Sequence, residues 1–138
     1  MILERPYSKP LVQLSSVGLR PTSQRMILAK LLFDGTRRHV TAEMLHYEVL
    51  GSQKKVSIAT IYNTLHLFTK LGLLREIIVD SDCSYFDTNT TNHHHFYRED
   101  TRELIDIDES DIQIGHLPKP PEGSQITRVD MVVRTKKV

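Results

Sequence analysis

The sequence is poor in cysteine, and its 138 residues include a single one, Cys83. One thiol cannot form an internal disulfide, and it cannot supply a cysteine-rich zinc site from one chain. Long apolar runs are also missing, because no stretch approaches the length that a helix needs to cross a bilayer. The opening MILERPYSKP carries an acidic residue and two prolines where a signal peptide has its apolar core. These absences predict a cytoplasmic protein with no membrane partner.

An excess of charge of one sign is absent overall, since 18 Lys/Arg stand against 17 Asp/Glu. The two halves nevertheless differ. Residues 1–76 contain 11 basic and 5 acidic residues, a balance of +6, whereas residues 77–138 contain 7 and 12, a balance of −5. This division indicates two parts with different roles, and the basic part is a candidate for contact with phosphate groups.

Helical periodicity is present in the basic half, and it predicts three helices within residues 21–35, 39–51 and 56–72. A serine or threonine stands at the start of each, where its side chain can bond the free amides of the first turn. Glycine follows the first and third helices, as is typical of helix ends. The expected capping residues are Thr22 or Ser23, Thr41 and Ser57, and the expected end points are Gly35 and Gly72.

The third predicted helix has one apolar stripe and one face of small and polar residues. An exposed face with little charge is unusual for a helix that meets only water. Asparagine can bond adenine through two hydrogen bonds, and the methyl groups of threonine and alanine can contact thymine. The predicted buried stripe is Ile58, Ile61, Leu65 and Phe68, and the opposite face is Ala59, Thr60, Asn63 and His66.

After residue 72 the period changes to about two, as expected for strands. Residues 74–80 and 83–89 flank Ser81-Asp82, a two-residue hairpin turn. Three helices followed by a hairpin predict a winged helix-turn-helix. Further strands are predicted at 93–99, 103–107 and 127–135, with a proline-rich loop at 116–124. The predicted fold class is α+β, with a winged-helix DNA-binding domain at 1–89 and a small α/β dimerisation and ligand-sensing domain at 90–138.

A DNA-binding role follows from the third helix and the basic residues around it. Tyr62 at the edge of the exposed face can add apolar contact or bond a phosphate. Other basic side chains, Arg37, Arg38, Lys54, Lys55 and Lys70, are candidates for phosphate contact. The candidate DNA-binding residues are Arg20, Arg25, Ser57, Thr60, Tyr62, Asn63 and His66.

Several segments together resemble the ferric uptake regulator (Fur) family of bacterial metal-responsive repressors. They are RPTSQRMILAKLL, HVTAEML, VSIATIYNTLHLFTKLGLL, YFDTN and HHHFY, in the family's order. Within the family, RHVTAEML, YFDTN followed by HHH, and PPEGSQITRVDMVVR are most similar to the haem-responsive iron response regulator (Irr) branch. The resemblance implies a homodimer on an inverted-repeat operator in double-stranded DNA, with a role in iron and haem homeostasis.

The sequence departs from the family pattern in its cysteines. Most Fur proteins carry Cys-x-x-Cys just after the histidines, where this chain has FYREDTREL. A four-cysteine structural zinc site is therefore not expected. The Cys-Pro haem motif of some Irr proteins is also absent, so histidine would be the main haem ligand.

Three adjacent histidines, His93, His94 and His95, are the most unusual motif. Successive residues of a strand point to opposite faces, so the three cannot converge on one ion unless the backbone bends. They are either solvated hinge residues or ligands. The resemblance implies a regulatory site of His39, Asp87 and His95 between the two domains.

An N/O ligand set without thiolate suits Fe(II), Mn(II) or Zn(II), and imidazole is also a common axial haem ligand. We expect Tyr97 as a fourth ligand, and Glu103 or His116 near His94. The candidate metal ligands are His39, Asp87, His94 and His95, and the candidate haem ligands are His93, His94 and His95.

The predicted function is a transcription regulator in which a ligand at the hinge sets the spacing of two recognition helices. Haem, a divalent metal (Fe, Mn or Zn) and a partner enzyme of haem synthesis remain alternatives for the input. An enzyme is not expected. A metal-dependent hydrolase would need a motif such as His-Glu-x-x-His or a nucleophile elbow, and the sequence contains neither. A winged-helix protein-interaction module is the other alternative, and it would show no salt-dependent DNA affinity.

Overall fold

The computed structural model describes residues 8–138, so the first seven residues of the opening MILERPYSKP lie outside the described part. The chain divides into two compact units, residues 1–90 and 91–138, and each is described by itself. Within the described residues, every helix is too short or too polar to pass through a membrane.

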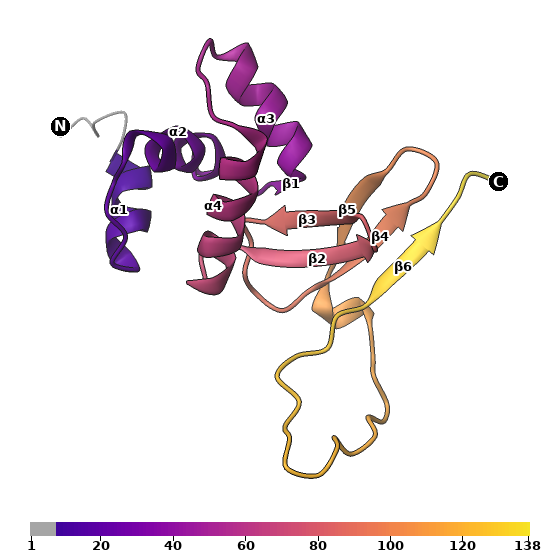
Figure 1. The fold of residues 1–138 in the computed structure, drawn as a ribbon. Helices are drawn as coiled ribbons and strands as arrows, with labels where there is room; N and C mark the ends of the chain where they lie inside the picture. Colours follow the sequence, from indigo (N-terminus) through magenta and orange to yellow (C-terminus); the bar gives the residue numbers. More distant parts are fainter. Residues whose placement is uncertain (1–7) are drawn as a thin grey trace, which may run out of the picture. The chain divides into compact units, whose positions relative to one another are not determined.

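The first unit combines four helices with a small antiparallel sheet (Figure 1). The sheet has the strand order β1-β3-β2, and β2 and β3 form the predicted hairpin across residues 81–82. The elements are α1 (Ser8–Ser16), α2 (Ser23–Leu32), β1 (His39–Val40), α3 (Ala42–Gly51), α4 (Ile58–Lys70), β2 (Arg75–Asp80) and β3 (Cys83–Asp87).

The predicted helix starts are confirmed, because hydroxyl groups cap all three helices. Thr22, Thr41 and Ser57 accept hydrogen bonds from backbone amides three residues later, at 3.3, 3.1 and 3.1 Å. These bonds satisfy amides that have no partner within the helix. The predicted end at Gly35 is late, because α2 ends at Leu32 and Gly35 lies in the following turn.

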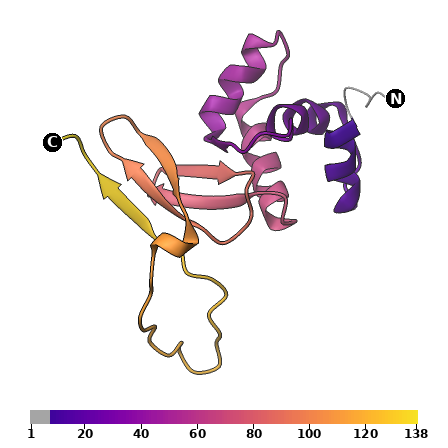
Figure 2. The same cartoon turned by 180° about the vertical axis from the view of Figure 1, so that it is seen from behind.

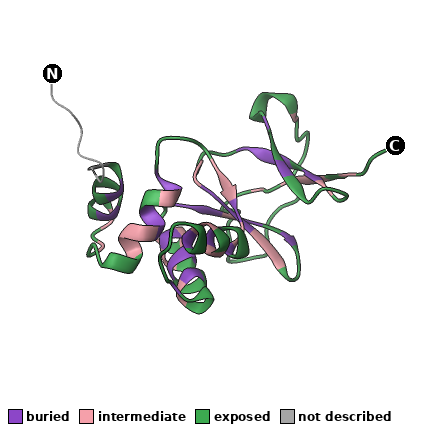
Figure 3. Cartoon of the chain, turned by 90° about the horizontal axis from the view of Figure 1, so that it is seen from above, coloured by how far each residue is buried: buried purple, intermediate pink, exposed green. Residues whose placement is uncertain are grey.

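Helix α4 contributes three fully buried residues to the core of the first unit, and Figure 3 colours the buried residues of the chain purple. Ile61, Leu65 and Phe68 are fully buried, as predicted. Ile58 is 38% exposed, so its prediction as a core residue is wrong. It is the first residue of the helix, and the stripe is completed instead by Thr64, which lies between Ile61 and Phe68 on the same face.

Two elements of the first unit were not predicted from the sequence. Helix α1 is short and includes Pro10, which is tolerated because it lies in the first turn. Its Leu14 is fully buried in the core. Strand β1 has only two residues, His39 and Val40, and it exists through its pairing with β3 rather than through its own propensity.

The second unit is a three-stranded sheet of order β5-β4-β6, in which β5 pairs antiparallel and β6 pairs parallel with β4. A long loop at residues 112–131 leads to β6 and extends away from that sheet (Figure 2). The predicted proline-rich loop lies within it, and the strand predicted at 127–135 is confined to its last four residues. The elements are β4 (His94–Arg98), β5 (Glu103–Ile107), η1 (Glu109–Asp111) and β6 (Val132–Thr135).

Two isoleucines of α4 test this description of the core. We expect Ile61→Ala to lower the free energy of unfolding by about 2–5 kcal/mol, because it leaves a cavity at a fully buried position. The matched change Ile58→Ala should cost clearly less, since that side chain is 38% exposed. Urea unfolding followed by circular dichroism measures both. Equal losses for the two variants would contradict the burial described here.

Candidate metal centre and nucleic-acid interface

The first unit holds a buried imidazole–carboxylate pair, His39 and Asp87. They face each other across the β1–β3 pairing, and Nε2 of His39 lies 3.1 Å from Oδ2 of Asp87. The Asp87 side chain is 1% exposed. A carboxylate this deeply buried needs positive charge or several hydrogen bonds, because its desolvation is costly.

The backbone around Asp87 supplies part of that compensation. The amide of Asn89 donates to Oδ1 of Asp87 at 2.8 Å. Arg75 stands opposite Asp87 in the β2–β3 register and is itself buried, so a guanidinium lies on the same face of the sheet. Asp87 in β3 therefore has Arg75 of β2 on one side and His39 of β1 on the other.

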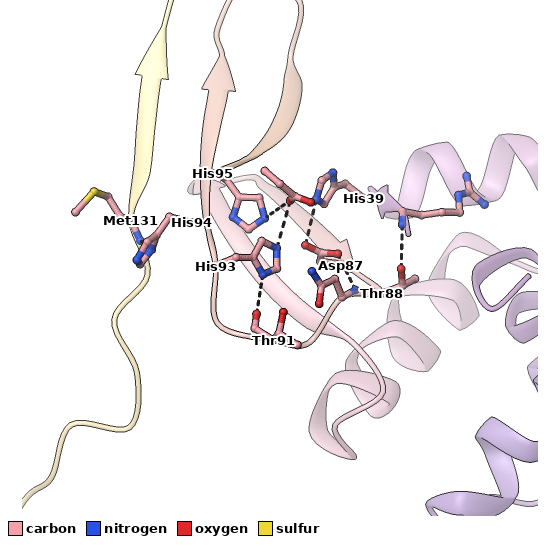
Figure 4. A network of polar contacts seen from close by, with 11 residues as sticks. His39, Asp87, Thr88, Thr91, His93, His94, His95 and Met131 are labelled. Carbon is pink, nitrogen blue, oxygen red and sulfur yellow. Dashed lines mark hydrogen bonds and ion pairs between the residues drawn. The ribbon is translucent and has the colours of Figure 1, made fainter. Parts of the chain in front are cut away.

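The second unit holds a group of three, formed by two imidazoles and one carboxylate. Nε2 of His93 and Nε2 of His95 lie 3.3 and 3.2 Å from the same atom, Oδ1 of Asp106 (Figure 4). The two rings meet edge to face with their centroids 4.5 Å apart. One ligand atom from each of these residues lies within 4.8 Å of the other two, as metal binding requires.

The contacts of His93 show how this group can accept a cation. Its Nδ1 lies 2.6 Å from the carbonyl oxygen of Thr91, and a carbonyl can only accept, so the contact assigns a proton to Nδ1. In a neutral ring Nε2 would then present a lone pair to the Asp106 carboxylate. A further proton on the ring or on the carboxyl group, or a positive ion between the two atoms, makes this contact favourable. A histidine whose other nitrogen bonds a carbonyl is the usual form of a metal ligand.

His94 lies apart from its two neighbours, as the alternation of a strand predicts. It is on the opposite side of β4, beside Met131, whose amide donates to Nδ1 of His94 at 3.1 Å (Figure 4). The structure therefore does not bring His94 together with His95, and its role as a ligand stays a prediction. The same alternation prevents His93, His94 and His95 from presenting their rings to one side as a haem-binding triplet.

Asp106 is the ligand candidate that sequence reasoning missed, although it falls within the strand predicted at 103–107. It lies in β5 directly opposite His95, so the two side chains share one face. The strand prediction for residues 93–99 and 103–107 contained this signal. Pairing them in register across the turn would have placed an acid beside the histidines.

The structure places the other residues expected around the triplet, and the role of Tyr97 as a ligand stays a prediction. Tyr97 is buried, and the guanidinium carbon of Arg134 lies 5.4 Å from the centroid of its ring. Glu103 lies opposite Arg98, at the far end of the β4–β5 pair from His94. His116 is in the exposed loop before β6.

The polar face of α4 is exposed, and its residues differ in whether their side chains already have hydrogen-bond partners within the protein. Ser57 and Thr60 bond each other at the helix start, with 2.9 Å between their hydroxyl oxygens. The hydroxyl of Tyr62 donates to Glu43 at 2.5 Å, which raises the pKa of Tyr62 above its ordinary value. Among residues 8–138 Asn63 has no hydrogen-bond partner, so its amide is the group best placed to bond a base.

His66 and the basic residues complete the candidate DNA interface. His66 is exposed, stacks on Tyr62 and lies 3.6 Å from Glu76. Nη1 of Arg25 donates to the carbonyl of Arg20 at 3.0 Å, which fixes the segment that leads into α2. Arg38 has a structural role, since it pairs with Glu48 at 2.6 Å.

Comparisons with known proteins agree with this architecture. Residues 16–133 match the sequence profile described as the Ferric uptake regulator family. The peroxide-responsive repressor PerR of Staphylococcus aureus (strain Mu50 / ATCC 700699) is 30% identical over 105 residues, which cover 76% of this chain and 70% of that protein.

Two solved structures show the fold. The ferric uptake regulator from Pseudomonas aeruginosa with manganese has a TM-score of 0.69 at 22% identity and covers 93% of this chain and 97% of its own. The Vibrio cholerae ferric uptake regulator has a TM-score of 0.70 at 20% identity and covers 90% and 96%. The predicted α+β fold class, with a helical first domain and a small sheet-containing second domain, is confirmed.

Proposed function

The chain belongs to the ferric uptake regulator family, and on that premise we propose that it is a homodimeric DNA-binding repressor controlled by a divalent cation. Members of this family are metal-responsive transcription regulators and not enzymes. The ligand, the ligating residues and the operator contacts depend on the side chains of this chain.

The observation that supports a cation is the acceptor-rich group of His93, His95 and Asp106. Two imidazole nitrogens face one carboxylate oxygen, and one of those rings uses its proton on the Thr91 carbonyl. His39 and Asp87 offer a second pair of the same chemistry. We propose that all five bind one ion, which gives three nitrogen and two oxygen donors. This set suits Fe(II), Mn(II) or Zn(II).

The position of these ligands in the chain indicates how binding would control DNA affinity. Asp87 ends β3 in the first unit, and only residues 88–92 separate it from His93 in the second. An ion held from both sides would restrict this connector. In a dimer, that restriction would fix the spacing and angle of the two α4 helices, which must match half-sites about one turn of DNA apart.

Dimerisation is supported by the outer face of the second sheet. Phe96 and Ile105 pair across β4 and β5 and are 38% and 40% exposed. Two neighbouring apolar side chains on the face opposite the histidine–aspartate group are suited to a contact with a second copy. A unit this small also gains core from such a contact.

Haem is the second candidate ligand, because three consecutive imidazoles are available and all three are buried. Three further proposals depend on haem as the ligand. They are the assignment to the iron response regulator branch, a role in haem homeostasis and a haem-synthesis enzyme as partner. They are supported by the sequence motifs quoted above and by the missing Cys-x-x-Cys. The ring of His94 points to the opposite face of β4 from His93 and His95, which favours a small ion over a flat macrocycle. If haem does bind here, we expect it to lower operator affinity.

Two neighbouring histidines provide a matched test of the cation site. We expect His95→Ala to weaken Mn(II) binding on the order of 100-fold, because it removes a ligand nitrogen. His94→Ala should leave Mn(II) affinity within about threefold of the wild type, since its ring lies on the other face of β4. Isothermal titration calorimetry at fixed pH measures both. Equal losses in the two variants would contradict the proposed ligand set.

The same titrations separate the two candidate ligands. A wild-type protein that binds no Mn(II), Fe(II) or Zn(II) but gives a saturating Soret shift with haem would overturn the cation proposal. Loss of that shift in a variant with alanine at residues 93–95 would then assign haem to the triplet.

Asn63 provides the corresponding test of the DNA interface. We expect Asn63→Ala to reduce the discrimination between a selected operator and a scrambled duplex by about 1–3 kcal/mol, because a base contact is lost. Lys54→Gln should instead weaken binding to both duplexes alike, as loss of a phosphate contact does. Fluorescence anisotropy at one salt concentration measures the four affinities. Unchanged discrimination in Asn63→Ala would exclude it as a reading residue.

A further inference from the structure

A cavity of about 500 Å³ lies in the first unit, at the end of that unit where α1 begins and α2 ends. Its walls combine apolar and cationic side chains. Val12, Leu32 and Phe33 supply apolar surface, Lys9 and Arg37 supply positive charge, and Thr88 closes one side. Its volume lies in the range of about 300–1,000 Å³ that is typical of sites for small organic molecules.

The helices bring these residues together through their ordinary geometry. Lys9, Val12 and Gln13 stand at i, i+3 and i+4, so they share one face of α1. Leu32 and Phe33 are the last residue and the C-cap of α2. Nζ of Lys9 would lie only 2.9 Å from a Cβ at Gly35, so the lysine reaches across to the turn after α2.

The two cations have no anionic partner in the described part of the chain. Among residues 8–138 neither Lys9 nor Arg37 forms a hydrogen bond or ion pair. The nearby Asp34 carboxylate is engaged within its own turn, where it accepts from the amide and hydroxyl of Thr36 at 2.9 and 2.7 Å. No acidic side chain is among the described residues that line the cavity.

We propose that this cavity binds a small amphipathic organic anion. Its carboxylate groups would meet Arg37 and Lys9, and its apolar body would rest on Val12, Leu32 and Phe33. Arginine suits this task because its planar guanidinium bonds a carboxylate through two parallel hydrogen bonds, and lysine adds a point charge.

DNA phosphate is the other source of negative charge for two exposed cations, and the apolar part of the cavity favours an amphipathic anion over it. The candidate DNA residues Arg20 and Arg25 lie where α1 has ended and α2 begins, whereas the cavity lies at the other ends of the same two helices. A phosphate backbone offers no apolar body to rest on Val12 and Phe33, so it would use the two cations alone.

Naphthalene-2-carboxylate is a suitable probe because it combines one carboxylate with a rigid apolar body. Binding to the full chain is followed by nuclear magnetic resonance of backbone amides. We expect saturable shifts of the amides of Gly35, Thr36 and Thr88. The uncharged naphthalene-2-carboxamide should bind at least about tenfold more weakly, since it loses the interaction with both cations.

Variants with matched charge locate the site. The double change Lys9→Gln and Arg37→Gln should weaken the carboxylate about tenfold or more and leave the weak binding of the amide unchanged. Lys136→Gln with Lys137→Gln removes the same charge from the second unit and should have no effect. Both double variants change exposed residues, and thermal unfolding checks that each remains folded.

Three outcomes would overturn the proposal. One is a set of shifts confined to residues outside the cavity, and another is equal affinity of the carboxylate for the Lys9/Arg37 variant and the wild type. The third is a non-specific DNA duplex that shifts the amides of Gly35, Thr36 and Thr88 while the carboxylate does not. That result would assign the two cations to nucleic acid.

Discussion

The burial of one carboxylate constrains the first unit more than any other single feature. Asp87 is 1% exposed, and a charge in that position is stable only if opposite charge and hydrogen bonds surround it. Strand β1 consists of two residues: its pairing with β3 sets His39 against Asp87, and Val40 is fully buried in the core. The strand thus places an imidazole beside a carboxylate. The core formed by the four helices and the hairpin holds both in place.

The second unit repeats the same chemistry by a different route. The register of β4 and β5 sets Asp106 opposite His95, on the face of the sheet where His93 also contacts it. In this second group two imidazoles face one carboxylate oxygen, and the ring of His93 already has the Thr91 carbonyl as a partner for its Nδ1. The proposed cation would supply the positive charge that such a group favours.

Much of the architecture could be predicted from the sequence, since its signals are local. Thr22, Thr41 and Ser57 identify helix starts, and Ser81-Asp82 identifies a hairpin, without any knowledge of the tertiary fold. The parts that could not be predicted depend on partners distant in sequence. Strand β1 forms only against β3, and helix α1 is held by the burial of Leu14 rather than by a strong helical pattern.

The candidate site divides in the same way. His39, Asp87 and His95 were expected from family resemblance, and the direction of His94 followed from strand alternation. Asp106 was missed because nothing in its own strand marks it as a ligand. Its role depends on register, which requires the pairing partner of its strand to be known. The hydrogen bond of Tyr62 to Glu43 and the ion pair of Arg38 with Glu48 are likewise tertiary contacts, so the pattern of a single helix does not predict them.

The most direct test of the account is the affinity of the wild-type protein for its selected operator, measured by fluorescence anisotropy with and without saturating Mn(II). If the cation controls DNA binding, the operator should bind at least about tenfold more tightly with the ion, a coupling of about 1.4 kcal/mol between the two ligands. An operator affinity that the ion leaves unchanged, or weakens, would contradict the claim that the histidine–aspartate groups control DNA binding.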